Sequence, residues 1–150
     1  MNHYCTYFDS GFLAQGIALW RSLRRHDPVA VLWVLALDDE AVNVLRRLGD
    51  ESLRVVDLAD LEAGDPELLA VKPTRSRVEY FFTLSPCWPR WLLRTQPEIA
   101  RITYLDADLF FFGSTKDLFD ELGSGSILLC EHGFPAYLRH YEKHGRYNMG

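Results

Sequence analysis

The 150-residue sequence is poor in cysteine and lacks long apolar runs. Its three cysteines, Cys5, Cys87 and Cys130, are odd in number and widely spaced, which excludes a disulfide framework and a cysteine zinc site. We expect all three to be buried thiols in a reducing compartment. The longest apolar run covers residues 29–37, whereas a membrane-spanning helix needs about 20 residues. The sequence therefore predicts no membrane span.

The sequence also lacks the motifs and the charge balance of common nucleotide- and nucleic-acid-binding proteins. Neither G-x-G-x-x-G nor a Walker A sequence occurs, which excludes dinucleotide oxidoreductases and P-loop NTPases. The formal net charge is −5, so no nucleic-acid partner is expected, because the phosphates would be repelled. The N-terminus does not have the basic and then apolar design of a signal peptide, and we expect a cytoplasmic protein.

What is present is a globular composition, with 48% hydrophobic and 25% charged residues. The length predicts one compact domain over 1–150. Apolar, β-rich runs predict strands at 3–8, 30–37, 53–57, 101–106 and 126–131, with another extended piece at 109–112. They alternate with helical segments, which predicts a layered α/β fold with a mainly parallel sheet.

The expected helices cover 10–26, 38–48, 74–95, 115–122 and 135–144, with short helical turns at 58–71. Ser10 is expected to cap the first helix, and its apolar positions, Leu13, Ile17, Trp20 and Leu23, predict the buried face. Pro86 and Pro89 are expected to break or kink the segment 74–95, giving two helices with Ser85 as a cap.

The most informative segment is 102–112, in which Asp106 and Asp108 interrupt an apolar run. On a strand both side chains would project to one side, with α-carbons about 6.6 Å apart. Buried like charges need a cation, and oxygen ligands favour Mg²⁺ or Mn²⁺. The alternative is that the pair caps a turn and binds nearby arginines.

The positions of the acidic residues favour the metal site. Asp9, Asp38 and Asp106 each follow a predicted strand, and ligands of open α/β sheets bind beyond the carboxyl ends of strands. A second group, Arg75, Arg77 and Glu79, lies at a predicted helix start. Arg75 and Glu79 share a helical face and could form only a surface ion pair, while the arginines suit phosphate oxygens.

Taken together, the segments 6–9, 75–80, 104–108 and 147–150 resemble nucleotide-sugar glycosyltransferases of the GT-A fold, in particular the glycogenin and lipopolysaccharide galactosyltransferase group, glycosyltransferase family 8. The Asp-x-Asp segment is the specific part of this resemblance. It implies a three-layer Rossmann-like fold and transfer of a sugar, with retention, from a UDP-sugar donor to a saccharide, lipid or protein acceptor. A homo-oligomer is compatible with it.

For the donor, the resemblance implies that Thr6 and Asp9 hold the uracil and the ribose. Arg75, with Arg77 as the alternative, would approach the sugar or the diphosphate. Asn148 and Gly150 match the start of the segment that shapes the sugar and acceptor side.

For the metal, the resemblance implies that Asp106 contacts the ribose and the ion. Asp108 would ligate the Mn²⁺ or Mg²⁺ that bridges the diphosphate. With Arg75, these two residues would form the catalytic set. The family completes its metal site with a downstream histidine, which this sequence does not reach, and His132 is a candidate substitute. We expect the chain to be the front part of a longer protein, without the acceptor-binding portion.

Two other interpretations remain open. A haloacid dehalogenase-type phosphotransferase also ends an apolar strand in Asp-x-Asp, although usually on its first strand. The chain could also be a non-catalytic nucleotide-binding fragment.

Overall fold

The computed structural model describes residues 2–125 and 127–147. The chain divides into two compact units, Met1–Gly113 and Ser114–Gly150. In the part described, no helix combines the length and the apolar character needed to cross a membrane.

The first unit is built on four strands, β1 (His3–Phe8), β2 (Val31–Ala36), β3 (Leu53–Asp57) and β4 (Ile102–Tyr104). They lie in the order β3-β2-β1-β4, and every pairing is parallel. The mainly parallel sheet is therefore confirmed. The predicted strand 101–106 is shorter than expected, although the Leu105 amide still donates to the carbonyl of Cys5 at 2.8 Å.

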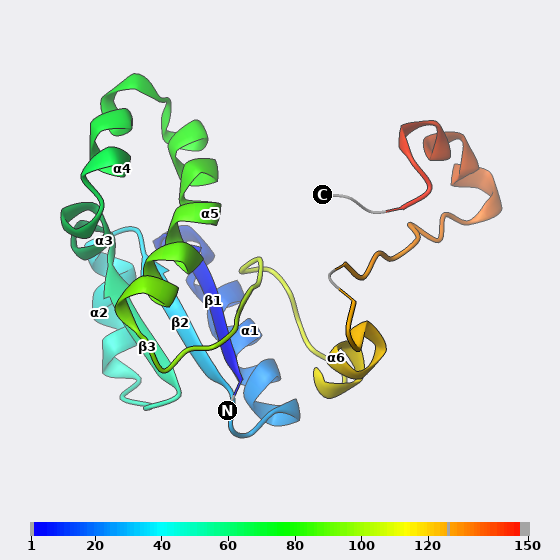
Figure 1. Ribbon diagram of the computed structural model, residues 1–150, viewed down its shortest axis with the longest axis horizontal. Coiled ribbons are helices and arrows are strands. Elements are labelled where there is room, and N and C mark those ends of the chain that lie inside the picture. The colour runs from blue at the N-terminus through cyan, green and yellow to red at the C-terminus, as the bar shows by residue number, and fades with distance from the viewer. Residues whose placement is uncertain (1, 126, 148–150) are drawn as a thin grey trace. The chain divides into compact units, whose positions relative to one another are not determined.

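The strand order places a reversal beside β1. From β1 the chain continues outward to β2 and β3, and then returns along α5 (Arg77–Thr95) to β4 on the other side of β1 (Figure 1). The strand order therefore reverses between β1 and β4, and a crevice opens at the carboxyl ends of the strands at such a point in α/β sheets.

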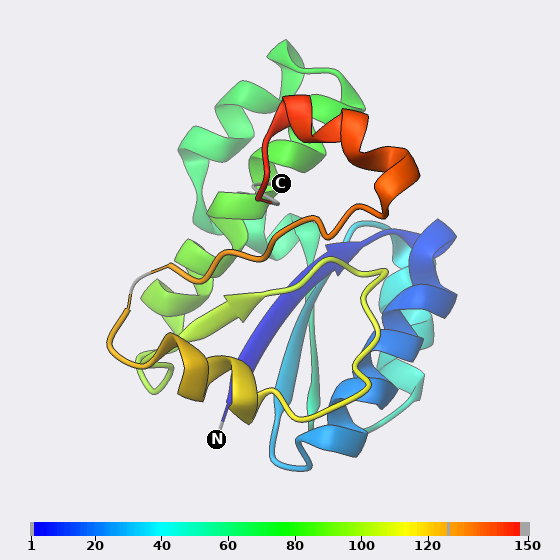
Figure 2. The same cartoon turned by 90° about the vertical axis from the view of Figure 1, so that its right-hand side faces the viewer.

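Helices cover both faces of the sheet, with α1 (Leu13–His26) and α5 on opposite sides (Figure 2). The predicted apolar positions of α1 are correct for Leu23, which is buried, whereas Leu13, Ile17 and Trp20 are only half-buried. The other buried residues of the helix are Gly16, Leu19 and Ser22. A Cβ at position 16 would lie 2.3 Å from the ring of Phe8. The missing side chain at Gly16 thus lets α1 lie directly against β1.

The remaining helices of this unit are short. They are η1 (Ser10–Phe12), α2 (Asp39–Arg47), α3 (Leu58–Gly64), α4 (Pro66–Val71) and η2 (Lys72–Thr74). Helices α3 and α4 correspond to the helical turns predicted for 58–71.

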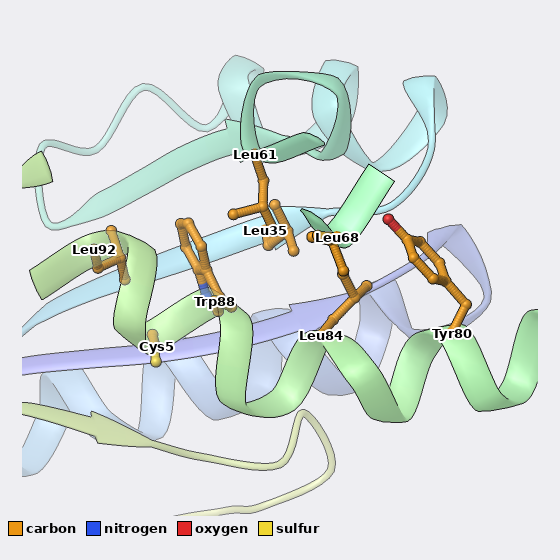
Figure 3. Packing of buried hydrophobic residues seen from close by; sticks show 8 residues of the cluster. All are labelled: Cys5, Leu35, Leu61, Leu68, Tyr80, Leu84, Trp88 and Leu92. Carbon is orange, nitrogen blue, oxygen red and sulfur yellow. The ribbon is translucent and has the colours of Figure 1, made fainter. Parts of the chain in front are cut away.

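Helix α5 is continuous, so the predicted break at Pro86 and Pro89 is wrong. Each proline removes one backbone donor from the helix. Four side chains spaced one turn apart oppose that loss, because they pack into a buried cluster with residues of β1, β2, α3 and α4 (Figure 3). The four are Tyr80, Leu84, Trp88 and Leu92. Each such burial contributes about 1.5–3 kcal/mol.

The second unit contains α6 (Lys116–Leu122) and the 3-10 helix η3 (Ala136–His144). The predicted helix 115–122 is confirmed, whereas 135–144 is 3-10 and not α-helical. Within 127–131 no strand forms; Glu131 alone makes an isolated bridge, to Tyr147. Residues 109–112, in the first unit, are not a strand either. Neither segment has a neighbouring strand to pair with in the part described, and isolated extended segments are unstable.

The cysteines differ from one another in exposure. Cys5 is buried, Cys87 is half-buried and Cys130 is exposed, so the prediction of three buried thiols is correct only for Cys5. Burial raises the pKa of the Cys5 thiol to about 12.

Candidate functional site

A cavity of about 480 Å³ opens at the carboxyl ends of β1 and β4, where the strand order reverses. Its polar lining includes three carboxylates, and its apolar lining comes from β1, η1, α5 and the residues after β2. The lining residues are Tyr7, Phe8, Asp9, Phe12, Leu37, Phe81, Phe82, Tyr104, Asp106, Ala107 and Asp108. Three of the carboxylates predicted for the site thus meet in one place.

Asp106 and Asp108 lie in a turn and not on a strand. The amide of Leu109 donates to the carbonyl of Asp106 at 3.2 Å, and both aspartates are exposed. The assumption that they are buried is therefore wrong, because β4 ends at Tyr104 before reaching them. Among the described residues no ion pair involves either carboxylate, and both residues line the cavity.

Asp9 joins β1 to the start of α5. One carboxylate oxygen accepts the Gly11 amide at 3.1 Å and caps η1, and the other accepts Nη2 of Arg77 at 2.7 Å. The predicted cap, Ser10, instead donates through its amide and its hydroxyl to Asp38, at 2.9 and 2.8 Å. The segment after β1 is thus fixed both by Arg77, which binds Asp9, and by Asp38, which binds Ser10.

Asp38 has a structural role, because it is not among the residues that line the cavity. Its second oxygen accepts the Ala41 amide at 2.8 Å and caps α2. Although burial acts to raise it, hydrogen bonds from Ser10 and Ala41 hold the pKa of Asp38 below its ordinary value. The carboxylate remains an acceptor, which fixes the loop after β1 to the start of α2.

The two candidate arginines occupy different places. Arg77, the first residue of α5, contacts Asp9 and lies over the ring of Phe81 at 5.2 Å. Arg75 precedes the helix and does not line the cavity. The predicted pairing of Glu79 with Arg75 along a helix face is replaced by a capping box, in which Glu79 accepts from the amide and hydroxyl of Ser76.

Two tyrosines that were not predicted as site residues line the cavity beside the carboxylates. Tyr7 in β1 and Tyr104 in β4 have ring centroids 5.8 Å apart. Burial raises the pKa of Tyr104 above its ordinary range, and the neighbouring Tyr7 and Asp106 raise it further. The position of Tyr104 immediately before Leu-Asp-Ala-Asp, at a strand end, was the available signal.

Thr6 is placed differently from the other residues of the predicted site. Its side chain is fully buried and does not line the cavity. Within the described part of the chain, its Oγ1 has no hydrogen-bond partner. The strand alternation turns Thr6 to the face of Tyr4 and Phe8, toward α1, and away from the face of Tyr7.

Three other predicted residues lie outside this cavity or outside the described residues. His132 belongs to the second unit, where its ring stacks on Phe134 at 4.8 Å. Asn148 and Gly150 lie outside the residues that the structure describes.

The donor set of the cavity fits a divalent cation only in part. Mg²⁺ typically binds one or two carboxylates and completes its shell with water and substrate phosphates, which is what Asp106 and Asp108 could supply. Over residues 2–125 and 127–147, no group of three or more His, Cys, Asp or Glu residues could hold a metal. An ion in this cavity would thus depend on oxygens from a ligand.

The sequence is similar to two proteins of Bacillus subtilis (strain 168). It is 33% identical over 156 residues to the uncharacterized protein YfnF, covering 98% of this chain and 50% of that protein. It is 30% identical over 149 residues to the uncharacterized protein YfnD, covering 99% of this chain and 47% of that protein. The chain thus spans about half the length of these curated relatives. No protein-family model matches the sequence.

The fold is similar to that of mouse xyloside xylosyltransferase 1 in its apo form. The two structures align with a TM-score of 0.55 and 20% sequence identity, over 82% of this chain and 48% of that one. At this identity the likeness concerns the fold. The chain has a Rossmann-like α/β fold of the GT-A type, as the sequence resemblance predicted.

Proposed function

We propose that this chain is the donor-binding part of a metal-dependent glycosyltransferase, which takes a sugar from a UDP-sugar and passes it to a saccharide, lipid or protein acceptor. The observation that supports this proposal most is the cavity at the reversal between β1 and β4, lined by Asp9, Asp106 and Asp108. The fold likeness to a xylosyltransferase is consistent with it. We assign the chain, within this proposal, to the N-terminal part of a family 8-like enzyme.

The charges of the cavity explain why the proposal includes a metal. A nucleoside diphosphate is an anion, and three carboxylates would repel it. Asp106 and Asp108 would hold Mn²⁺ or Mg²⁺, and such an ion stabilises the negative charge that develops on the leaving diphosphate. Arg77 is the first residue of α5 and would add a positive charge next to Asp9.

The apolar lining suits the rest of the donor. The rings of Phe12, Phe81 and Phe82 line the cavity, and Phe82 is 70% exposed. Exposed aromatic rings offer flat surfaces to a nucleobase. In this arrangement the nucleobase would lie toward the aromatic rings and the diphosphate toward Asp106 and Asp108. Retention at the anomeric carbon is proposed from the family resemblance.

The haloacid dehalogenase alternative is less consistent with the fold. Those enzymes usually place the nucleophilic aspartate after their first strand, whereas Asp106 follows β4, at the edge of the described sheet. Covalent modification of Asp106 by a phosphate mimic would favour that alternative.

Nucleotide titration tests the proposal. The chain is titrated with UDP, GDP and ADP, each with Mn²⁺ and with the metal removed by a chelator, and binding is followed by calorimetry. We expect UDP to bind most tightly and its affinity to fall when the metal is removed. Equal affinities with and without Mn²⁺, or no binding of any diphosphate, would contradict the proposal.

A further inference from the structure

The turn that carries the two cavity aspartates, residues 106–109, is fixed to the sheet at its start. The Leu105 amide donates to the carbonyl of Cys5 at 2.8 Å, which continues the pairing of β4 with β1. The chain then leaves the sheet, and the Leu109 amide closes the turn on the carbonyl of Asp106 at 3.2 Å. We call residues 106–109 the Asp-Ala-Asp turn. Because both of its aspartates are exposed, their own burial does not fix their positions.

The segment that follows the Asp-Ala-Asp turn is fixed to α1, which lies on the opposite face of the sheet from α5 (Figure 2). The Phe111 amide donates to the hydroxyl of Ser22 at 3.0 Å. The neighbouring Phe110 lines a second cavity, of about 300 Å³, together with residues of α1. The Asp-Ala-Asp turn is therefore held between two fixed points, β1 on one side and α1 on the other.

Ser22 is oriented to accept the bond from Phe111. Its side chain is buried, and its hydroxyl donates to the carbonyl of Leu19 in the same helix at 2.8 Å. A serine hydroxyl has a single proton and two lone pairs, so the oxygen remains free to accept from the Phe111 amide. Removing the hydroxyl would take this acceptor away while leaving the backbone of α1 unchanged.

We infer that Ser22 is a positioning residue of the donor site, which orders the Asp-Ala-Asp turn from α1. This inference rests on the proposed function. Residues 105–111 form neither helix nor strand, so the hydrogen bonds near the two ends of this segment limit its freedom. A segment that is ordered before its ligand arrives loses less conformational entropy on binding, and the ligand binds more tightly.

The first test measures the affinity of the 150-residue chain for Mn²⁺ in the presence of UDP. Ser22→Ala removes the hydroxyl, Ser22→Cys keeps its shape but offers only a weak acceptor, and Ser22→Thr keeps the hydroxyl. We expect the Mn²⁺ affinity to fall by about 10-fold in Ser22→Ala and nearly as far in Ser22→Cys. Ser22→Thr should stay near the wild type. An equal loss in Ser22→Thr would show that the hydroxyl is not responsible, which overturns the inference.

The second test needs neither metal nor nucleotide. Amide hydrogen exchange of the ligand-free chain reports how readily a segment opens locally. We expect exchange over residues 106–111 to be faster in Ser22→Ala than in the wild type, because one of the two fixed points is lost. Unchanged exchange over this segment would mean that Ser22 does not order the turn, and the inference would be wrong.

Ser52→Ala is the matched control. The hydroxyl of Ser52 also accepts from a group distant in sequence, Nε1 of Trp20 at 3.1 Å, and it donates to Asp50 at 2.6 Å. Ser52 is buried as well, and it does not line the cavity that holds Asp106 and Asp108. This variant should lose stability but keep the Mn²⁺ affinity of the wild type. If it loses as much affinity as Ser22→Ala, the effect comes from general loosening of the fold, and the inference fails.

The remaining outcomes separate the inference from the proposed function. Metal-dependent UDP binding in the wild type, with an unchanged Mn²⁺ affinity in Ser22→Ala, overturns the inference alone. No metal-dependent binding in the wild type overturns the proposed function and the inference with it. If Ser22→Ala fails to fold, Ser22→Cys provides the test, and wild-type Mn²⁺ affinity in that variant overturns the inference.

Discussion

Single residues at the carboxyl ends of β1 and β4 decide what the cavity can bind, and their surroundings differ from what the sequence suggested. Thr6 and Asp9 are close in sequence, yet Thr6 is fully buried whereas Asp9 lines the cavity. A polar side chain near a strand end can therefore face either the core or the site. The alternation of side chains along the strand determines which of the two it faces. A single sequence does not show which face of the strand is covered by a helix.

Thr6→Val tests whether the Thr6 hydroxyl contributes to the donor site. A buried hydroxyl without a partner costs about 1–3 kcal/mol of unfolding free energy, and valine fills nearly the same space. We expect Thr6→Val to be as stable as the wild type or more stable by about 1 kcal/mol, with the same UDP affinity. Denaturant unfolding and UDP titration measure the two quantities. A clear loss of UDP affinity would show that the hydroxyl reaches the ligand.

Arg77→Ala and Arg75→Ala compare two exposed arginines only two positions apart. Neither arginine lines the cavity itself, but Arg77 forms an ion pair with the cavity residue Asp9. We expect Arg77→Ala to weaken UDP binding by about 10-fold, as expected when a charged contact worth about 1.4 kcal/mol is lost. Arg75→Ala should change it much less. The reverse order of the two affinities would favour Arg75, the residue first expected from the family resemblance.

At the scale of elements, α5 connects the core to the cavity. Its buried side chains pack on the sheet, and its first turn carries Arg77 on Asp9. The capping box of Ser76 and Glu79 fixes the residue at which the helix begins. Hydrogen bonds from the side chain and the amide of Ser76 hold the pKa of Glu79 below its ordinary value of 4.5.

The capping box predicts a pH-dependent stability. Because the pKa of Glu79 is lower in the folded chain, its ionised form stabilises the fold; this contribution is present above pH 4.5 and disappears as the pH falls further. We expect Glu79→Ala to be less stable than the wild type at pH 7, with a smaller difference at pH 3. Thermal unfolding at the two pH values measures the difference. A difference that does not change with pH would contradict the role of the ionised carboxylate.

Most elements of the first unit were predictable, and the exceptions have physical causes. Strands β1, β2 and β3 match their apolar runs because both faces of the sheet are covered. The two prolines of α5 were misleading, since packing around Trp88 outweighs two missing backbone donors. The predicted strand at 126–131 is absent over 127–131, because pairing depends on a partner strand that a local pattern does not reveal.

On the scale of the whole molecule, the topology assembles the site. Asp9 is far in sequence from Asp106 and Asp108, and the three carboxylates meet because β1 and β4 are neighbours and parallel. Their convergence could be predicted from the strand-end rule. The aromatic walls and the tyrosines could not, because Phe81 and Phe82 reach the cavity only through the way α5 crosses the sheet.

The most direct test of the donor site is the UDP affinity of Asp108→Ala, measured by calorimetry with Mn²⁺ and with a chelator. Asp60→Ala is the control; it removes one exposed carboxylate of α3 that does not line the cavity. We expect Asp108→Ala to fold normally and to lose the Mn²⁺-dependent part of its UDP affinity, while Asp60→Ala behaves as the wild type. An Asp108→Ala chain whose UDP affinity still rises with Mn²⁺ as in the wild type would contradict the account.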